Sequence, residues 1–209
     1  VPLLGVNLGG FGYLTSVNLQ EMCSDMEKIL QGDYRIEQRM MLDVGVIRNG
    51  RQLSEHTVLN DAVISRGNSR RMINMETRVD QAYLTTYWSD GLIISTPTGS
   101  TAYSLAAGGP IMFPQLESII LNPICPHTLT NRPVILPGAS VVFISTKVRE
   151  GEAMLTLDGQ VLLSLGPNDV VEVKRSKYTT TLIDSPRRNY FEILRTKLGW
   201  GGAQNVNQP

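Results

Sequence analysis

One long stretch of the chain carries almost no charge, and this limits the folds that are possible. From Gly91 to Thr146 the only charged side chains are Glu117 and Arg132, and Gly91–Leu116 has none. A run of that length could span a bilayer. It nevertheless contains three prolines, four glycines and many hydroxyls, and lipid would leave its backbone without hydrogen-bond partners. We therefore expect a buried or ligand-facing segment of a soluble protein.

The rest of the composition excludes some partners. Lys and Arg number 19, as do Asp and Glu, so the formal net charge of the 209 residues is zero. Nucleic acid is not an expected partner, because no basic excess exists to neutralise phosphates. Cys23 and Cys125 are isolated and have neither metal-site nor redox spacing. This fits a reducing, cytoplasmic compartment, and no secretory signal follows Val1.

The first part of the chain predicts one strand and one helix. Pro2–Asn7 is a short apolar run that predicts a buried, parallel strand. Leu19–Leu30 places apolar side chains at helical spacing, which predicts an amphipathic helix. Asn18 or Ser16 could cap its start, and Gly32 suits its end.

After Asp33 the pattern changes to short strands separated by turn signals, which predicts a mostly β domain. Asn49–Gly50 and Asp158–Gly159 are hairpin signals of the type I′ turn. A short helix is expected from Ala102 to Ala107, and another near the end of the chain, stopped at Gly199. Further strand candidates are residues 140–146, 153–157, 160–164, 170–174 and 178–183.

Several familiar catalytic sites are absent from the sequence. No lysine follows a glycine, so there is no P-loop, and the third glycine of a Rossmann fingerprint is missing after Gly10–Gly12. The two histidines, His56 and His127, form no HExxH motif, and GxSxG is absent. A metal cage or a serine hydrolase is therefore not expected.

The segment Ser95–Ser104 is rich in hydroxyls: seven of its ten residues carry one. Free N–H groups at a helix start, together with these hydroxyls, could form a neutral surface that binds a ribose, a base or a phosphate. Tyr103 could stack on a base. The alternative is a capped turn between a strand and a helix, with Thr98, Ser100 or Thr101 as the cap.

Asn60–Asp61 offers a similar choice between binding and turn formation. The pair supplies an amide and a carboxylate that could read the hydroxyls of a ribose. Asn and Asp also simply favour turns, and the residues alone leave both interpretations open. Asp90–Gly91, which precedes the apolar run Leu92–Ile94, indicates a tight turn, and Asp158–Gly159 indicates a hairpin turn.

Taken together, four segments resemble the motifs of NAD kinases in the order in which those enzymes carry them. They are Gly5–Thr15, Leu59–Val63, the long signature Ser89–Tyr103, and Asp158–Gln160. The segments Pro126–Leu129 and Thr196–Trp200 also occur in bacterial members. The resemblance covers essentially the whole chain, and the signature around Thr96–Tyr103 is highly specific.

The resemblance implies a transferase that phosphorylates the 2′-hydroxyl of the adenosine ribose of NAD to make NADP. ATP or polyphosphate would be the donor, with a divalent metal such as Mg²⁺. The implied fold is α+β and mostly β here: a strand-rich C-terminal domain, related to that of diacylglycerol kinases, plus a remnant of an N-terminal α/β domain. The expected divisions are residues 1–15, 16–188 and 189–209, the last returning to the N-terminal domain. Family members are homodimers or homotetramers with shared active sites.

The resemblance also assigns residues to the NAD site. Asn60 and Asp61 would hold the adenosine portion, and Asp90 would bind the nicotinamide carboxamide. Arg71 and Gln160 would complete the pocket. The adenine end would be lined by Thr101, Ala102, Tyr103, Ser104, Leu105 and Ala106.

Two departures from the family pattern affect these expectations. The Gly-Gly-Asp-Gly motif, whose aspartate is the expected general base, would lie before Val1, so no catalytic residue and no metal ligand is assigned within the chain. Trp88 stands where several bacterial members carry a basic residue, which suggests tolerance of the reduced dinucleotide. The alternatives are a lipid kinase of the same superfamily, and a non-catalytic module for dinucleotide binding or oligomerisation.

Overall fold

The computed structural model describes residues 1–8, 12–15, 17–68, 71–148, 153–184 and 189–200. The chain forms two compact units, one made of Val1–Gln38 with Thr180–Pro209 and the other of Arg39–Thr179. The sequence placed the divisions at 15/16 and 188/189 instead. The helix after Asn18, which we expected in the strand-rich domain, lies in the first unit.

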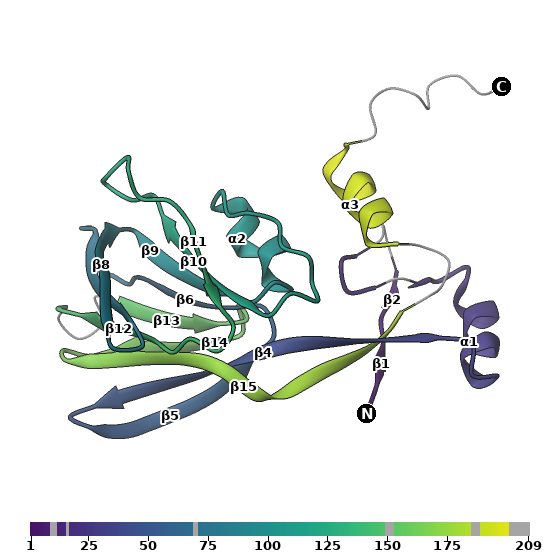
Figure 1. Cartoon of the computed structure of the whole chain (residues 1–209), viewed down its shortest axis with the longest axis horizontal. Helices are drawn as coiled ribbons and strands as arrows, with labels where there is room; N and C mark the ends of the chain where they lie inside the picture. Colours follow the sequence, from purple (N-terminus) through teal and green to yellow (C-terminus); the bar gives the residue numbers. More distant parts are fainter. Residues whose placement is uncertain (9–11, 16, 69–70, 149–152, 185–188, 201–209) are drawn as a thin grey trace. The chain divides into compact units, whose positions relative to one another are not determined.

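The second unit contains two mainly antiparallel sheets (Figure 1). In the first sheet the order is β5-β4-β15-β12-β7-β8. Its strands are β4 (Arg35–Arg48), β5 (Arg51–Val58), β7 (Ile73–Val79), β8 (Ala82–Ser89), β12 (Val142–Thr146) and β15 (Asp169–Asp184), of which β4 and β15 extend into the first unit. In the second sheet the order is β11-β10-β9-β6-β13-β14. Its strands are β6 (Asp61–Arg66), β9 (Gly91–Ser95), β10 (Ser118–Ile124), β11 (Val134–Pro137), β13 (Ala153–Leu157) and β14 (Val161–Leu165).

The inner faces of the two sheets form one hydrophobic core. Side chains alternate between the faces of a strand, so β6 buries Ala62 and Ile64 in this core and directs Asp61, Val63 and Ser65 to its outer face. The outer face of the second sheet is therefore available for a site.

The predicted hairpins are confirmed, and so is the mostly β fold. Asn49 and Gly50 have φ values of +52° and +74°, and Asp158 and Gly159 have +48° and +68°, as a type I′ turn requires. The candidates 140–146, 153–157 and 160–164 became strands within two residues of their predicted ends. The candidates 170–174 and 178–183 are instead one strand, β15. The polar residues between them contain no glycine or proline that would end it.

The first unit differs more from expectation. The predicted parallel strand is two short ones: β1 (Leu3–Leu4) pairs in parallel with Leu182 and Ile183, and β2 (Val6–Asn7) pairs with β3 (Val17–Asn18). The prediction of a single buried strand was wrong, because the chain changes its pairing partner after Leu4 and leaves Leu3 exposed.

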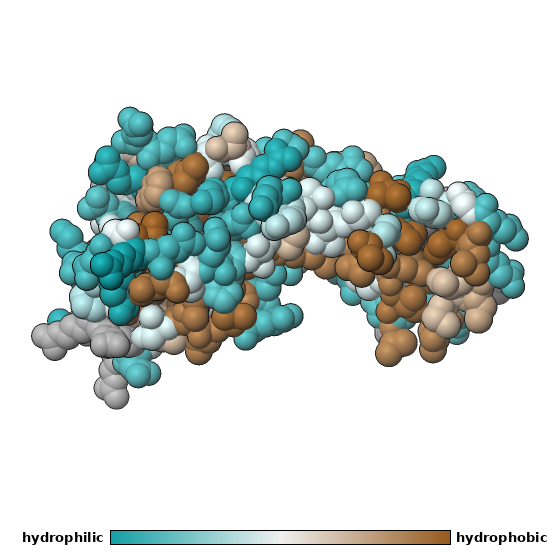
Figure 2. All heavy atoms as spheres, turned by 90° about the horizontal axis from the view of Figure 1, so that it is seen from below, coloured by the Kyte–Doolittle hydropathy of each residue, from teal (hydrophilic) through white to brown (hydrophobic). Residues whose placement is uncertain are grey.

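Both helices of the first unit lie close to their predicted positions. α1 (Met22–Leu30) starts after Asn18, whose Oδ1 accepts the N–H of Glu21 at 2.8 Å. α3 (Tyr190–Leu198) ends at Gly199 in the left-handed conformation. The apolar side of α1 is not buried within the first unit, since Leu30 is 80% exposed. Figure 2 shows apolar side chains gathered on the surface of this unit.

Within the described residues, no helix is long and apolar enough to cross a membrane. The uncharged segment Gly91–Leu116 forms β9, the single turn η1 (Gly99–Thr101) and the short helix α2 (Tyr103–Ala106). α2 is shorter than predicted and has no side-chain cap.

An ion pair between the buried Asp169 carboxylate and the partly exposed Arg48 stabilises the first sheet of the second unit. The Asp169 carboxylate accepts hydrogen bonds from Arg48 Nε at 2.7 Å, Arg48 Nη2 at 2.8 Å and Gly166 N at 2.7 Å. The hydrogen bonds from Arg48 keep the pKa of Asp169 below its ordinary value.

We expect Asp169→Asn to lower the free energy of unfolding by about 2 kcal/mol near neutral pH, since a buried charge-assisted hydrogen bond contributes about 1.5–3 kcal/mol. Because the folded-state pKa of Asp169 is depressed, this difference is present above about pH 4 and is lost as the pH falls. Urea unfolding of both proteins at several pH values measures it. If wild type and Asp169→Asn differed in free energy of unfolding by the same amount at pH 7 and at pH 3, the depressed pKa of Asp169 would be contradicted.

Candidate functional site

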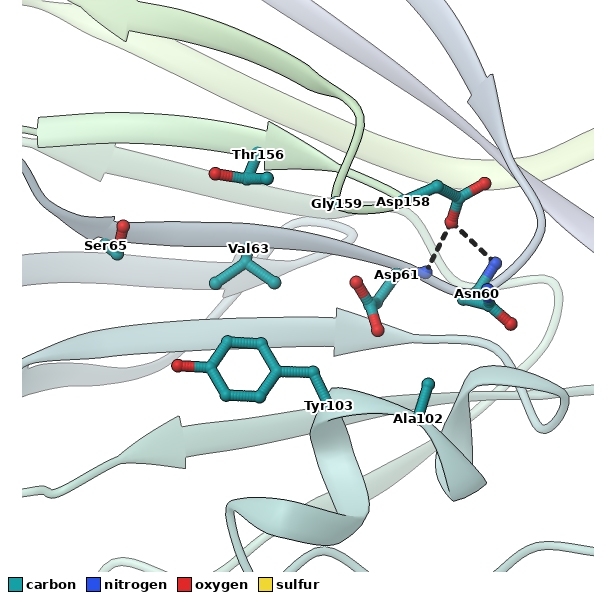
Figure 3. Close-up of a pocket in the computed structure, with 9 residues that line it drawn as sticks. All are labelled: Asn60, Asp61, Val63, Ser65, Ala102, Tyr103, Thr156, Asp158 and Gly159. Carbon is teal, nitrogen blue, oxygen red and sulfur yellow. Dashed lines mark hydrogen bonds between the residues drawn. The ribbon is translucent and has the colours of Figure 1, made fainter.

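A cavity of about 410 Å³ lies on the outer face of the second sheet (Figure 3). β6, β13 with its following turn, and the start of α2 surround it. Its lining residues are Asn60, Asp61, Val63, Ser65, Ala102, Tyr103, Thr156, Asp158 and Gly159.

The floor of the cavity follows from strand alternation. Asp61, Val63 and Ser65 share the outer face of β6, and Thr156 of β13 lies directly opposite Val63. The sequence analysis missed Val63, Ser65 and Thr156. The alternation of side chains along β6 could have indicated Val63 and Ser65, which share a face with Asp61. The pairing of β6 with β13, which brings in Thr156, could not be read from the sequence.

The Asp158 carboxylate holds the turn that enters β6. Its Oδ2 accepts the N–H of Leu59 at 2.8 Å, and its Oδ1 accepts those of Asn60 at 2.8 Å and Asp61 at 3.0 Å. The backbone N–H of Asp158 donates in return to the carbonyl of Asp61 at 3.0 Å. The hairpin turn and the Asn60–Asp61 turn, which the sequence presented as separate features, therefore form one unit.

Hydroxyls hold the same turn from the other side. Thr96 Oγ1 donates to the carbonyl of Leu59 at 2.6 Å, and Ser95 Oγ donates to that of Asn60 at 3.2 Å. Ser100 Oγ donates to the carbonyl of Pro97 and accepts the N–H of Met112.

These contacts correct one expectation. Ser95, Thr96, Ser100 and Ser104 are fully buried, so their hydroxyls do not form the expected donor-rich surface. Ser95, Thr96 and Ser100 donate to backbone carbonyls inside the protein instead, and Ser104 Oγ accepts a hydrogen bond from Asn122 Nδ2. The residues of the Ser95–Ser104 segment that line the cavity are Ala102 and Tyr103.

Tyr103 supplies the wall opposite the floor. Its ring extends along the cavity and is 48% exposed, so one side of the ring can receive a ligand (Figure 3). The neighbouring Ala102 is small and also faces the cavity.

Asp61 is the acidic group at the centre of the site. Its side chain points into the cavity although the residue is only 5% exposed (Figure 3). Burial, and secondarily the negative charge of Asp158, raises the pKa of Asp61 to about 6. Asp61 therefore changes its charge in a mildly acidic range, in which it can pass from hydrogen-bond donor to pure acceptor.

The structure brings four of the predicted binding residues together: Asn60, Asp61, Ala102 and Tyr103. Ser104 is buried behind them and is hydrogen-bonded to Asn122. The other predicted residues do not line this cavity; they are Arg71, Asp90, Thr101, Leu105, Ala106 and Gln160.

Asp90 lies beyond the far end of β6. It forms an ion pair with Arg66, with 3.5 Å between Arg66 Nε and Asp90 Oδ1. Gln160 belongs to the β13–β14 turn and donates its N–H to the carbonyl of Leu157. In the Gly5–Thr15 motif, residues 9–11 lie outside the described part of the chain.

In the described ranges, no three or more His, Cys, Asp or Glu residues come together in a way that could hold a metal ion.

The comparison with known proteins assigns the fold to a family. The ATP-NAD kinase C-terminal domain matches residues 59–185. The chain is 53% identical to the NAD kinase of Geobacter sulfurreducens over 96% of its own length and 71% of that protein. It is 51% identical to that of Syntrophotalea carbinolica, again over 96% of this chain and 70% of the relative.

Two solved structures have a similar fold. The structure of yeast NADH kinase complexed with NADH matches with a TM-score of 0.89 and 28% identity, over 99% of this chain and 61% of that one. An Archaeoglobus fulgidus NAD kinase in complex with ATP matches with a TM-score of 0.77 at 24% identity, over 93% of this chain and 74% of that one.

Asp61 predicts a specific pH dependence of stability. Its folded pKa is raised from 3.8 to about 6, so ionisation opposes folding, and stability falls as the pH rises between these values. Asp61→Asn removes this effect. We expect the variant to gain about 2 kcal/mol relative to wild type between pH 4 and pH 7.

Urea unfolding at intervals of half a pH unit measures this difference, with Asp33→Asn as an exposed control. If the free energies of unfolding of wild type and Asp61→Asn ran parallel across this pH range, the raised pKa of Asp61 would be contradicted.

Proposed function

This chain belongs to the NAD kinase family, and on that premise we propose that the cavity beside β6 binds the adenosine portion of NAD. The relatives give the chain the function of an NAD kinase, a phosphotransferase with NAD and ATP as substrates. The observation that supports the site is the convergence of Asn60 and Asp61 with Ala102 and Tyr103, which are about forty residues apart in the sequence.

The geometry suits a nucleoside. A cavity of this volume lies within the range of small-molecule sites, roughly 300–1,000 Å³. We propose that Asn60 and Asp61 hydrogen-bond the ribose and the adenine, because an amide and a carboxyl group provide both donors and acceptors. The ring of Tyr103 covers the adenine by stacking, and the small side chain of Ala102 allows close approach.

The remaining predicted residues are assigned by family resemblance. We propose that Asp90 binds the nicotinamide carboxamide, with Arg71 and Gln160 at the edge of the dinucleotide site. Thr101, Leu105 and Ala106 support the adenine end. Ser104 is buried, so we propose that it acts through the position of α2 rather than by touching the ligand.

The reaction we propose is phosphorylation of the 2′-hydroxyl of the adenosine ribose of NAD, giving NADP, with ATP or polyphosphate as donor. A divalent cation, Mg²⁺ by preference, supplies charge neutralisation at the transferred phosphoryl group. The described residues do not form a metal cluster, so we assign no ligand to it and propose that it arrives with the donor's phosphates. The aspartate of a Gly-Gly-Asp-Gly motif as general base stays a prediction.

We also propose a homo-oligomer, a dimer or a tetramer, with shared active sites. Val161 and Leu162 are exposed on β14, which lies at the edge of the second sheet and gives a partner an apolar surface. A reducing, cytoplasmic compartment suits Cys23 and Cys125, which are free and exposed thiols.

Asn60→Ala combined with Asp61→Ala tests the site. We expect kcat/KM for NAD to fall roughly 100-fold, because several hydrogen bonds of about 0.5–3 kcal/mol each are removed. The measurement is a coupled assay of NADP formation from NAD and ATP, using the full-length gene product. Asn74→Ala with Asp33→Ala, at two exposed positions, is the matched control. Retained NADP formation in the double variant would refute the site.

Trp88 supports a proposal about the reduced dinucleotide. It is 45% exposed, and its ring stacks on His127 with 4.3 Å between centroids. The backbone N–H of His127 also donates to the carbonyl of Trp88 at 2.9 Å. The exposed indole of Trp88 carries no charge and offers the neutral reduced nicotinamide ring an apolar surface, and the yeast relative named above was solved with NADH. We propose that this chain accepts NADH as well as NAD.

Trp88→Arg tests this idea, since arginine removes this apolar surface and introduces a basic residue of the type that several bacterial members of the family carry here. We expect the ratio of kcat/KM for NADH to kcat/KM for NAD to be at least about threefold higher in wild type than in the variant. Side-by-side kinetics with both dinucleotides measure the ratio. A ratio that is equal in the two proteins, or lower in wild type, would refute the proposal.

A further inference from the structure

A buried amide lies beneath the helix that carries Tyr103. Asn122 is in the middle of β10, between the buried residues Leu121 and Pro123, and is 1% exposed. An amide is costly to bury unless it is hydrogen-bonded, so its partners indicate what it does.

The Nδ2 group of the Asn122 side chain is hydrogen-bonded to Ser104 of α2. Its Nδ2 donates to the carbonyl of Ser104 at 2.9 Å and lies 3.3 Å from Ser104 Oγ. The N–H of Gly109 donates to the same carbonyl at 2.8 Å. A Cβ at residue 109 would lie 2.3 Å from Ser104 Oγ and 2.7 Å from Asn122 Nδ2, so this close packing requires glycine.

These bonds determine where α2 lies. A helix of four residues is far too short to be stable by itself, so its position depends on tertiary contacts. Within α2, Ser104 directly follows Tyr103. Fixing the carbonyl of Ser104 therefore also fixes the backbone from which the Tyr103 ring extends along the cavity (Figure 3).

We infer that Asn122 is a positioning residue of the dinucleotide site, which holds α2 so that Tyr103 and Ala102 form the wall against the adenosine. This inference rests on the proposed function of the cavity. Asn122 is not one of the residues that line the cavity. A directional hydrogen bond can set the position of a wall more narrowly than apolar packing, and a displacement of about 1 Å is enough to weaken a site.

The test uses Asn122→Leu, which keeps the volume and removes the donor, and Asn122→Asp, which places a carboxylate against the Ser104 carbonyl. We expect KM and Kd for NAD to rise about tenfold in both variants, while kcat changes less than about threefold. Calorimetric titration with NAD and steady-state NADP formation provide the two readouts.

A double-mutant cycle separates positioning from general loss of stability. In a Tyr103→Ala background, Asn122→Leu should change KM less than about twofold, because the ring that it positions is gone. Ile119→Val is a matched destabilised control, since Ile119 is buried on the inner face of the same strand. It should lower Tm without raising KM.

Two outcomes overturn the inference. One is a KM for NAD that stays within twofold in Asn122→Leu; the other is a tenfold effect that persists undiminished in the Tyr103→Ala background. Wild-type protein that fails to bind NAD would instead refute the proposed function, and the inference with it.

Discussion

The site depends on the carboxylate of Asp158. It accepts three consecutive backbone N–H groups, those of Leu59, Asn60 and Asp61, and so joins the β13–β14 turn to the start of β6. Partly buried N–H groups without a partner would each be costly, so this one side chain stabilises the conformation of the turn. The same negative charge lies close to Asp61 and contributes to its raised pKa. Geometry and electrostatics at this end of the cavity thus have one origin.

The uncharged segment of the sequence completes this arrangement from the other side. Asp158 binds the amides of the turn, whereas Thr96 and Ser95 donate to its carbonyls. The backbone of the turn is satisfied on both sides, and the Asp61 side chain is left facing the cavity (Figure 3). Hydroxyls serve this purpose better than charged groups, because they can be buried fully once they are hydrogen-bonded to carbonyls. The lack of charge after Gly91 is therefore explained by internal support of the site.

Local patterns predicted the local structure well. The Asn-Gly and Asp-Gly pairs indicated both type I′ turns, and alternation indicated β13 to within a residue. Motif resemblance grouped Asn60, Asp61, Ala102 and Tyr103, and these four residues line one cavity. Interactions between distant segments could not be predicted: Asp158 lies 97 residues after Asp61, and no local period links them.

The same limit explains the errors. The hydroxyls of Ser95 and Thr96 looked available to a ligand because their carbonyl partners belong to the Leu59–Asn60 turn, about 35 residues earlier in the chain. α1 has the pattern of a helix that packs on a core, yet Leu30 is exposed, since amphipathicity shows which side is apolar but not what covers it.

The composition of the cavity restricts which part of a dinucleotide it can accept. None of its nine lining residues is a lysine or an arginine, and two of them, Asp61 and Asp158, are acidic. Phosphate groups would be repelled there, above all near neutral pH, where Asp61 is mostly ionised. A neutral nucleoside meets no such repulsion, and the two carboxyl groups can accept hydrogen bonds from its hydroxyls. The cavity is therefore suited to reading the adenosine, while the phosphates of the dinucleotide and of the donor must be bound by groups outside these nine residues.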